Sequence, residues 1–138
     1  KFLNVVSNKL ILKNIKSKSS RYNEIISDPV NFVPVNKRYF KRLYNKYYGE
    51  VKGEKRKFGK CNLEISKSII EPKDNIKGDI ARIFRYMETR YNLKLIKPHT
   101  ANLFSLWELE DPINSIECQR VFNQNNGKFF GIFKNICE

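Results

Sequence analysis

Apolar residues in the second half of the chain recur at helical spacing. After Asp74-Asn75, either of which can cap a helix, apolar side chains return every three or four positions. This stripe consists of Ile80, Ile83, Phe84, Met87 and Tyr91. The pattern predicts an amphipathic helix that packs one face against a core.

A second helix is predicted over residues 98–109, and Asp111-Pro112 ends it because the residue before a proline disfavours helical geometry. The side chains expected to turn inward are Leu103, Leu106 and Trp107. A short third helix is predicted over residues 115–122. The apolar tail 129–133 must pack against another part of the chain.

The beginning of the chain has a mixed pattern. Residues 2–12 combine alternation with a short apolar run, which predicts a strand. Residues 13–22 are polar and rich in Lys and Ser, so a mobile basic loop is expected there. Pro29 and Pro34 then interrupt regular structure.

Helical spacing returns over residues 37–48, where apolar and aromatic side chains share one side. They are Phe40, Leu43, Tyr44 and Tyr47. Residues 52–60 form a charged, glycine-bounded loop, and residues 61–70 alternate weakly. Together the two halves predict an α+β, mainly helical single domain over residues 1–138.

The charge of the chain favours a polyanionic partner. The formal net charge is +13, from 27 Lys plus Arg against 14 Asp plus Glu. DNA, RNA or an anionic membrane surface would each be attracted to it. The alternative is a merely solvated surface, because the chain is rich in Lys, Asn and Ile throughout. No run reaches the roughly 18 apolar residues of a membrane-spanning helix, so we expect nucleic acid and no membrane partner.

Three groups of cations form the candidate binding surface. Basic side chains bind phosphates, and aromatic side chains interleaved with the first group can stack on unpaired bases. The predicted nucleic-acid-binding residues are Lys37, Arg38, Lys41 and Arg42, then Lys55, Arg56 and Lys57, and finally Lys77, Arg82 and Arg85. For any single position the alternative is a solvated cation beside a core aromatic. Contacts of this kind would be directed at the backbone and would not read sequence.

The helical half carries a recognisable string. Residues 77–82 read KGDIAR and are followed by Tyr86-Met87, Arg90-Tyr91, Trp107 and Glu117-Cys118. This order and spacing resemble the C-terminal part of bacterial endonuclease I, a family of periplasmic or secreted His-Me finger nucleases. The resemblance covers about residues 58–138.

Upstream, the resemblance continues more weakly. Ser27-Asp28, Asn31 and Pro34 look like the family's S-D-x-H-N-L-x-P segment, with Val30 in place of the histidine. Residues 1–26 match no part of the family that we identify from sequence. The resemblance therefore implies a family-like region over residues 27–138, a divergent segment over residues 1–26, and an endonuclease I scaffold with a degenerate ββα-metal region.

Catalytic residues of the family lack an evident counterpart. These nucleases use a W-E-H-V-V-P segment, in which the histidine activates a water and the glutamate helps to hold a divalent metal. The single histidine here is His99, which follows Pro98 at a predicted helix start, and no Glu-His pair exists. The family's metal-binding asparagine aligns near Phe40, with Asn36 and Asn45 close by. We therefore expect no catalytic residue, no metal ligand and no cofactor in this chain, and a surface or capping role for His99.

Four other residues invite a catalytic interpretation, and we expect structural roles for them. Asp79 lies at a predicted helix start, where a carboxylate stabilises free N–H groups. Trp107 is expected in the core. Glu71 and Glu117 are expected to hold neighbouring arginines.

The cysteines are interpreted through the same resemblance. It implies a disulfide between Cys118 and Cys137, and the alternative is two ordinary buried thiols. Such a bridge closes a loop of about 20 residues and would add roughly 3 kcal/mol in an oxidising compartment. Cys61 resembles a family cysteine whose partner is missing here.

Three functions are compatible with the sequence. The first is a catalytically inactive nucleic-acid-binding protein on an endonuclease I-like scaffold, for example a structural RNA-binding component of a ribonucleoprotein such as a ribosome, with other proteins of that particle as partners. The alternative is an active, non-specific Mg-dependent DNA/RNA endonuclease whose Glu-His segment lies outside this chain. A protein-interaction module is the third. A family-like protein would be periplasmic or secreted, and a repurposed one would belong to an organellar or cytoplasmic ribonucleoprotein.

Overall fold

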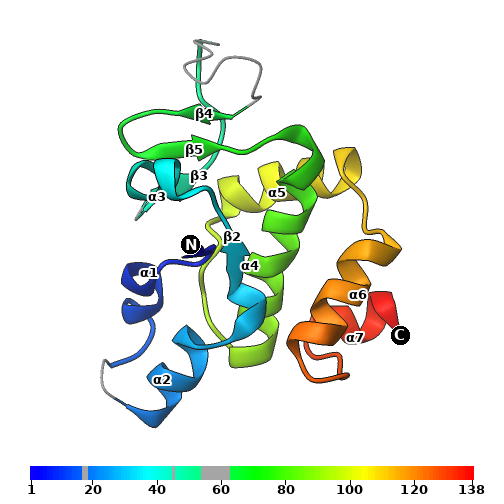
Figure 1. The fold of residues 1–138 in the computed structure, drawn as a ribbon. Coiled ribbons are helices and arrows are strands. Elements are labelled where there is room, and N and C mark those ends of the chain that lie inside the picture. The colour runs from blue at the N-terminus through cyan, green and yellow to red at the C-terminus, as the bar shows by residue number, and fades with distance from the viewer. Residues whose placement is uncertain (17–18, 45, 54–62) are drawn as a thin grey trace.

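Helix α4 (Lys77–Tyr91) runs through the centre of the molecule, and the other elements surround it (Figure 1). Every member of the predicted stripe is buried in the main core cluster, as expected. Ala81 and Tyr86 are fully buried as well, so α4 is enclosed on more sides than one stripe requires. The helix ends at Asn92, whose φ of 53° lies in the left-handed region that asparagine tolerates.

The computed structural model describes residues 1–16, 19–44, 46–53 and 63–138. In chain order the elements are β1 (Phe2–Asn4), α1 (Asn8–Leu12), α2 (Ser20–Ile26), the 3₁₀ helix η1 (Pro29–Asn31), β2 (Phe32–Pro34), α3 (Lys37–Leu43), β3 (Tyr47–Tyr48), β4 (Glu64–Ile65), β5 (Ile69–Glu71), the 3₁₀ helix η2 (Asp74–Ile76), α4, α5 (Pro98–Glu110), α6 (Ser115–Gln124) and α7 (Ile132–Cys137). The chain is therefore α+β and mainly helical, as predicted. Among the helices described, none has the length and apolar character needed to cross a bilayer.

Two small sheets lie beside the helices. Strands β1 and β2 pair antiparallel, with Leu3 opposite Val33. In the second sheet β5 is central: β3 pairs with it in parallel, with Tyr48 opposite Ile70, and β4 pairs with it antiparallel. Both sheets contribute to a second apolar cluster around Leu3, Leu43 and Ile70.

The prediction for the beginning of the chain was wrong in part. The strand expected over residues 2–12 is limited to β1, and the second part of that segment is helix α1. The expected basic loop also contains the start of α2. In both places a serine caps the new helix: Ser7 accepts a hydrogen bond from the Leu10 amide, and Ser19 accepts one from the Tyr22 amide. A side-chain cap of this kind favours a helix where the apolar alternation indicated a strand.

Two further predictions need correction. The helix expected over residues 37–48 ends at Leu43, because the chain turns there to form β3 beside β5. Tyr44 and Tyr47, expected on its inner side, are consequently about half exposed, at 53% and 50%. In α5, Leu106 was expected to face inward but is 55% exposed, whereas Trp107 next to it is buried in the core.

The start of α4 is capped from a distance in sequence. Asp74 and Asn75 lie in η2 and provide no side-chain cap for α4. Instead, the Asp111 carboxylate, just after α5, accepts hydrogen bonds from the amides of Gly78 (2.9 Å) and Asp79 (3.4 Å). The negative charge also complements the positive end of the helix dipole. No local pattern indicated this contact, because it joins two different helices.

Arg82 joins α4 to α6 through a buried ion pair. Its Nε and Nη2 donate to the two carboxylate oxygens of Glu117, each at 2.7 Å. Its Nη1 donates to the backbone carbonyl of Asp111 at 3.0 Å. Arg82 and Glu117 are 4% and 3% exposed, so each compensates the buried charge of the other, and Asp79 adds a second contact to Arg82 at 3.3 Å. The expectation that Glu117 holds an arginine is confirmed.

Asp28 joins the N-terminal half to α4. Its Oδ2 accepts hydrogen bonds from the hydroxyls of Tyr86 (2.7 Å) and Tyr91 (2.6 Å) and from Arg90 (3.1 Å). Burial, and then the nearby carboxylate, raises the pKa of both phenols, so both stay protonated and keep donating. The family-like aspartate of the S-D-x-x-N-x-x-P segment thus has a structural role here.

Cys118 of α6 and Cys137 of α7 form a disulfide, with Cα atoms 5.6 Å apart. Helix α7 also packs against α4, because Phe133 of α7 is fully buried beside Tyr86 of α4. The expected packing of the apolar tail is confirmed by this contact. The bridge and Phe133 together hold the C-terminal helix against α4.

Gly78 supplies a first test of the cap. A Cβ atom at this position would lie 1.9 Å from the Asp111 carbonyl oxygen and less than 3 Å from the Arg82 guanidinium. Gly78→Ala should therefore lower the free energy of unfolding by about 2 kcal/mol or more in urea denaturation. Without the clash, replacing glycine by alanine inside a helix would stabilise the protein by about 1 kcal/mol. A loss of stability would therefore confirm the close approach of the Asp111 carbonyl, and a gain would contradict it. Asn102→Ala, at an exposed position of α5, is the control and should change stability little.

Asp79 supplies a second test, on pH dependence. Burial, together with the charges of Glu117 and Asp111, raises the pKa of Asp79 to about 7 from an ordinary value of 3.8. Between these values the folded state binds a proton that the unfolded state has released, so stability falls as pH rises from about 4 to about 7. Asp79→Asn should remove this fall when unfolding is measured across that pH range. An unchanged slope in the variant would show that another group is responsible.

Candidate nucleic-acid interface

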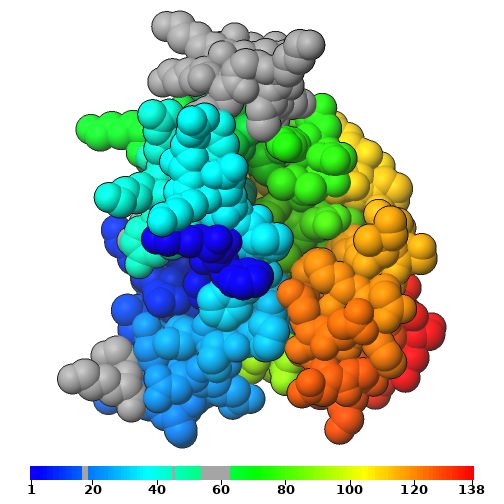
Figure 2. Space-filling view, in the orientation of Figure 1, coloured from blue at the N-terminus to red at the C-terminus, as the bar shows by residue number. Residues whose placement is uncertain are grey.

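Helix α3 presents the first group of predicted cations to solvent. Asn36 caps the helix by accepting a hydrogen bond from the Arg38 amide at 2.9 Å. The exposed cations are Lys37, Arg38, Lys41 and Arg42. Their spacing places them on one side of the helix, as positions i, i+1, i+4 and i+5. In Figure 2 this segment, coloured cyan, forms a prominent part of the visible surface.

The opposite side of α3 is apolar and fixes the helix in place. Leu43 is buried in the cluster with Leu3 and Ile70, and Tyr39 and Phe40 pack against the same cluster. The helix is therefore anchored to both small sheets. A basic surface on an anchored helix presents its charges in a fixed arrangement, which suits a regularly spaced row of phosphates.

The third group of cations is less exposed than the first. Lys55, Arg56 and Lys57 lie outside the described residues, so their predicted role stays a prediction. The third group is engaged in ion pairs. Lys77 is 7% exposed and contacts Glu71 (3.3 Å) and Asp74 (2.8 Å).

Arg82 and Arg85, the rest of the third group, also face carboxylates. Arg82 is enclosed by Glu117 and Asp111, and Arg85 pairs with Glu108 at 2.5 Å. A phosphate could reach Arg82 only by displacing a buried carboxylate, which would leave that charge without a partner. The structure therefore gives Lys77 and Arg82 a structural role, and their binding of nucleic acid stays a prediction. Glu71, expected beside an arginine, holds Lys77 instead.

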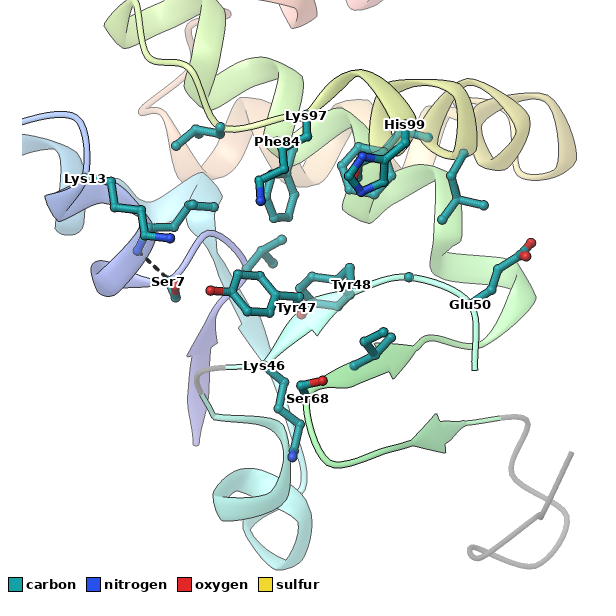
Figure 3. A pocket seen from close by; sticks show the side chains of 18 residues that line it. Ser7, Lys13, Lys46, Tyr47, Tyr48, Glu50, Ser68, Phe84, Lys97 and His99 are labelled. Carbon is teal, nitrogen blue, oxygen red and sulfur yellow. Dashed lines mark hydrogen bonds between the residues drawn. The ribbon is translucent and has the colours of Figure 1, made fainter. Parts of the chain in front are cut away.

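A pocket of about 440 Å³ opens between α1, β3 and the start of α5 (Figure 3). Its walls are aromatic: the Phe84 and Phe104 ring centroids lie 5.2 Å apart, and Tyr48 meets Phe84 edge-on at 6.0 Å. The charged side chains that line it are Lys13, Lys46, Lys97 and Glu50, and His99 lines it as well. His99 is exposed, as expected for a residue near the start of a helix.

Sequence reasoning missed this pocket. Lys13, Lys46 and Lys97 are far apart in the chain, and none belongs to a basic cluster. Only the packing of α1 and the start of α5 around β3 brings them to one opening. The one local signal was Tyr47-Tyr48, which we assigned to the end of a helix.

Strands β1 and β2 pair antiparallel and α3 follows β2, but α1, α2 and η1 lie between the two strands in the chain, so the degenerate ββα-metal region stays a prediction. The residues at the positions aligned with the family's site do not fit a metal. Val30 is fully buried among apolar side chains, and the Asn36 side chain is used as the α3 cap. Asn45 lies outside the described residues. Within the described ranges, no three His, Cys, Asp or Glu side chains are grouped so that they could hold a metal ion.

Comparison with known proteins supports the sequence resemblance. The family model described as Endonuclease I matches residues 17–129. The chain is 30% identical over 108 residues to Endonuclease-1 of Buchnera aphidicola subsp. Acyrthosiphon pisum, an alignment that covers 75% of this chain and 43% of the relative. It is 28% identical over 117 residues to a periplasmic deoxyribonuclease of Aeromonas hydrophila, covering 83% of this chain and 48% of the relative.

An extracellular deoxyribonuclease of Aeromonas hydrophila is 27% identical over 117 residues, covering 83% of this chain and 50% of the relative. The chain thus spans about half the length of the curated relatives it matches. The family model begins at residue 17, before the start we assigned to the family-like region, and it includes α2, strands β2 to β5 and the central helix. A match over most of the chain shows the relationship directly: this chain belongs to the endonuclease I family.

Proposed function

We propose that this chain is the nucleic-acid-binding part of an endonuclease I-type nuclease, and that Mg-dependent cleavage needs a Glu-His segment outside this chain. The observation that carries the proposal is the basic side of α3. Its four cations are exposed on a helix whose other side is buried, so they form a preset surface for a phosphate backbone.

Exposed aromatic side chains lie directly after this helix. Tyr44 and Tyr47 are half exposed directly after α3, and the Tyr44 ring stacks on Phe40 with centroids 5.8 Å apart. Exposed rings next to phosphate-binding cations are the combination found where proteins hold single-stranded nucleic acid. The relatives named deoxyribonucleases make DNA the first ligand to test, and RNA the second.

One observation favours a second candidate, a catalytically silent nucleic-acid-binding protein. Although the family model begins only at residue 17, Val5-Val6 can be aligned with the V-V of the family's W-E-H-V-V-P segment, which would put the positions of the glutamate and histidine at Leu3 and Asn4. Leu3 is 5% exposed within an apolar cluster, and the Asn4 amide donates to Asn8 Oδ1 at 3.4 Å. On this interpretation β1 occupies the catalytic strand without its chemistry. A place in a ribonucleoprotein stays a prediction that no observation here favours.

Binding through α3 predicts a specific salt dependence. Replacing Lys37, Arg38, Lys41 and Arg42 by Gln should weaken binding to duplex and single-stranded DNA. Each phosphate that the variant no longer neutralises should reduce the slope of log affinity against log salt by about 0.9 for duplex DNA. Fluorescence anisotropy over a salt series measures both quantities. The matched control removes four exposed lysines elsewhere, Lys73, Lys94, Lys128 and Lys134; an equal effect in the control would mean that only net charge matters.

Cleavage separates the two candidates. With plasmid DNA and magnesium, the unsubstituted chain should leave the DNA intact. If the missing segment lies outside the chain, nicking should appear when a polypeptide that carries the family's W-E-H-V-V-P segment is added, and should vanish when the histidine of that segment is replaced by alanine.

If β1 occupies the catalytic strand, Asn4→His should give magnesium-dependent nicking, alone or with Leu3→Glu, and the added polypeptide should give none. The single change is included because a glutamate at buried Leu3 could destabilise the fold. Nicking by the unsubstituted chain with magnesium would contradict both candidates.

A further inference from the structure

We propose that the pocket between α1, β3 and α5 takes in one unpaired nucleotide, with its base against the aromatic wall and its phosphate between Lys13 and Lys97. This inference rests on the proposed binding of nucleic acid and adds a substrate class to it. The preferred ligand would be a strand that has at least one unstacked nucleotide, in place of continuous duplex.

The wall of the pocket suits a flat, partly apolar group. Phe84, Phe104 and Leu103 line the aromatic wall, and the Tyr48 ring stands edge-on to Phe84. The volume of about 440 Å³ lies within the range of small-molecule pockets and accommodates a base with its sugar. Aromatic faces contribute stacking energy with any base, so the pocket would select for an unpaired nucleotide without selecting a sequence.

The rim of the pocket suits a phosphate. Lys13 and Lys97 are exposed, and in Figure 3 both side chains extend toward the side of the pocket where Tyr47 lies. Lys46 has a different role, because its Nζ donates to the carbonyls of Ser66 (3.1 Å) and Lys67 (2.6 Å) and points away from the opening. Glu50 also points away. The charge facing a ligand at this rim is therefore positive.

The position of the pocket connects it to the basic side of α3. Strand β3 is the next element after α3 in the chain, and Tyr47 of β3 lines the pocket while remaining 50% exposed. A strand whose phosphates lie along α3 would therefore pass Tyr44 and Tyr47 before it reaches the opening. A base inside a duplex cannot enter, because its faces are stacked and its edge is paired, so entry requires an unpaired or flipped nucleotide.

His99 provides a direct probe of occupancy. It is the single histidine of the chain and lines the pocket, so its imidazole gives one assignable NMR signal. Titration with adenosine 5′-monophosphate should shift this signal in a saturable way. Adenosine and inorganic phosphate, each alone, should bind at least about tenfold more weakly, because each uses half of the site. A shift with phosphate that equals the shift with the nucleotide would overturn the base contact and leave an anion site only.

Two variants test the pocket on nucleic acid. Thr100→Trp fills the opening from the first turn of α5 without changing charge, and Lys13→Gln with Lys97→Gln removes the phosphate contacts. Both should weaken binding of a single-stranded oligonucleotide by about tenfold and leave a blunt duplex of the same sequence nearly unchanged. The matched control is Lys73→Gln with Lys94→Gln, which removes the same charge from exposed positions that do not line the pocket.

The outcomes separate this inference from the proposed function. If single strands bind and the two pocket variants behave like the control, the pocket is overturned while nucleic-acid binding stands. If adenosine monophosphate shifts His99 but neither oligonucleotide binds, the pocket stands as a mononucleotide site and the proposed function falls. If neither adenosine monophosphate nor either oligonucleotide binds, the pocket inference and the proposed function are both wrong. Failure of the Trp variant to fold leaves the double lysine variant to decide.

Discussion

The buried pair of Arg82 and Glu117 is the interaction on which the arrangement of helices depends. It fixes α6 against α4, and the same guanidinium holds the Asp111 carbonyl, so the end of α5 is tied to the start of α4. A charge this deeply buried is tolerated only because each hydrogen-bonding group has a partner in good geometry. Gly78 completes the arrangement by leaving room for the Asp111 backbone. Removing Arg82 would leave the Glu117 carboxylate buried without its counterion, whereas Arg82 would keep a contact with Asp79 at 3.3 Å if Glu117 were removed.

A second constraint joins the two halves of the chain. Asp28 accepts hydrogen bonds from two tyrosine hydroxyls and from Arg90, all of α4. The Asn31 side chain accepts a hydrogen bond from the Val6 amide and donates one to the Val6 carbonyl. These contacts hold β1, β2 and α3 in a fixed position relative to α4. The basic side of α3 and the pocket beside β3 are therefore parts of one framework. The proposed binding surface therefore depends on polar groups that lie outside it.

The sequence predicted the helical half well because its signals are local. The stripe of α4, the proline at the end of α5 and the apolar tail each depend on neighbours a few residues away, and each prediction agreed with the structure. Where the prediction was wrong, a distant contact decided. Asp111 caps α4 from beyond α5, and pairing with β5 ends α3 at Leu43. Leu106 shows the same limit. Periodicity predicts which side of α5 is apolar, but it does not predict how much of that side other elements cover.

For the site, the sequence indicated the cations of α3 but could not separate them from Lys77 and Arg82. Both sets are basic residues at helical spacing, and only the facing carboxylates distinguish a solvent-exposed cation from a buried ion pair. The pocket was hidden for a related reason, because its lysines come from three distant segments. The sequence shows where the basic residues are, but only the folded structure shows which side chains lie next to them.

The string KGDIAR has a consequence for how relationships of this kind are recognised. Its glycine makes room for a passing carbonyl, its arginine holds a glutamate on another helix, and its isoleucine and alanine fill the core. These four residues are constrained by the packing and ion pairing of the fold. Descendants of a nuclease would keep such a signature under selection for stability alone. Sequence similarity over this region therefore measures shared architecture, and function has to be argued from the site.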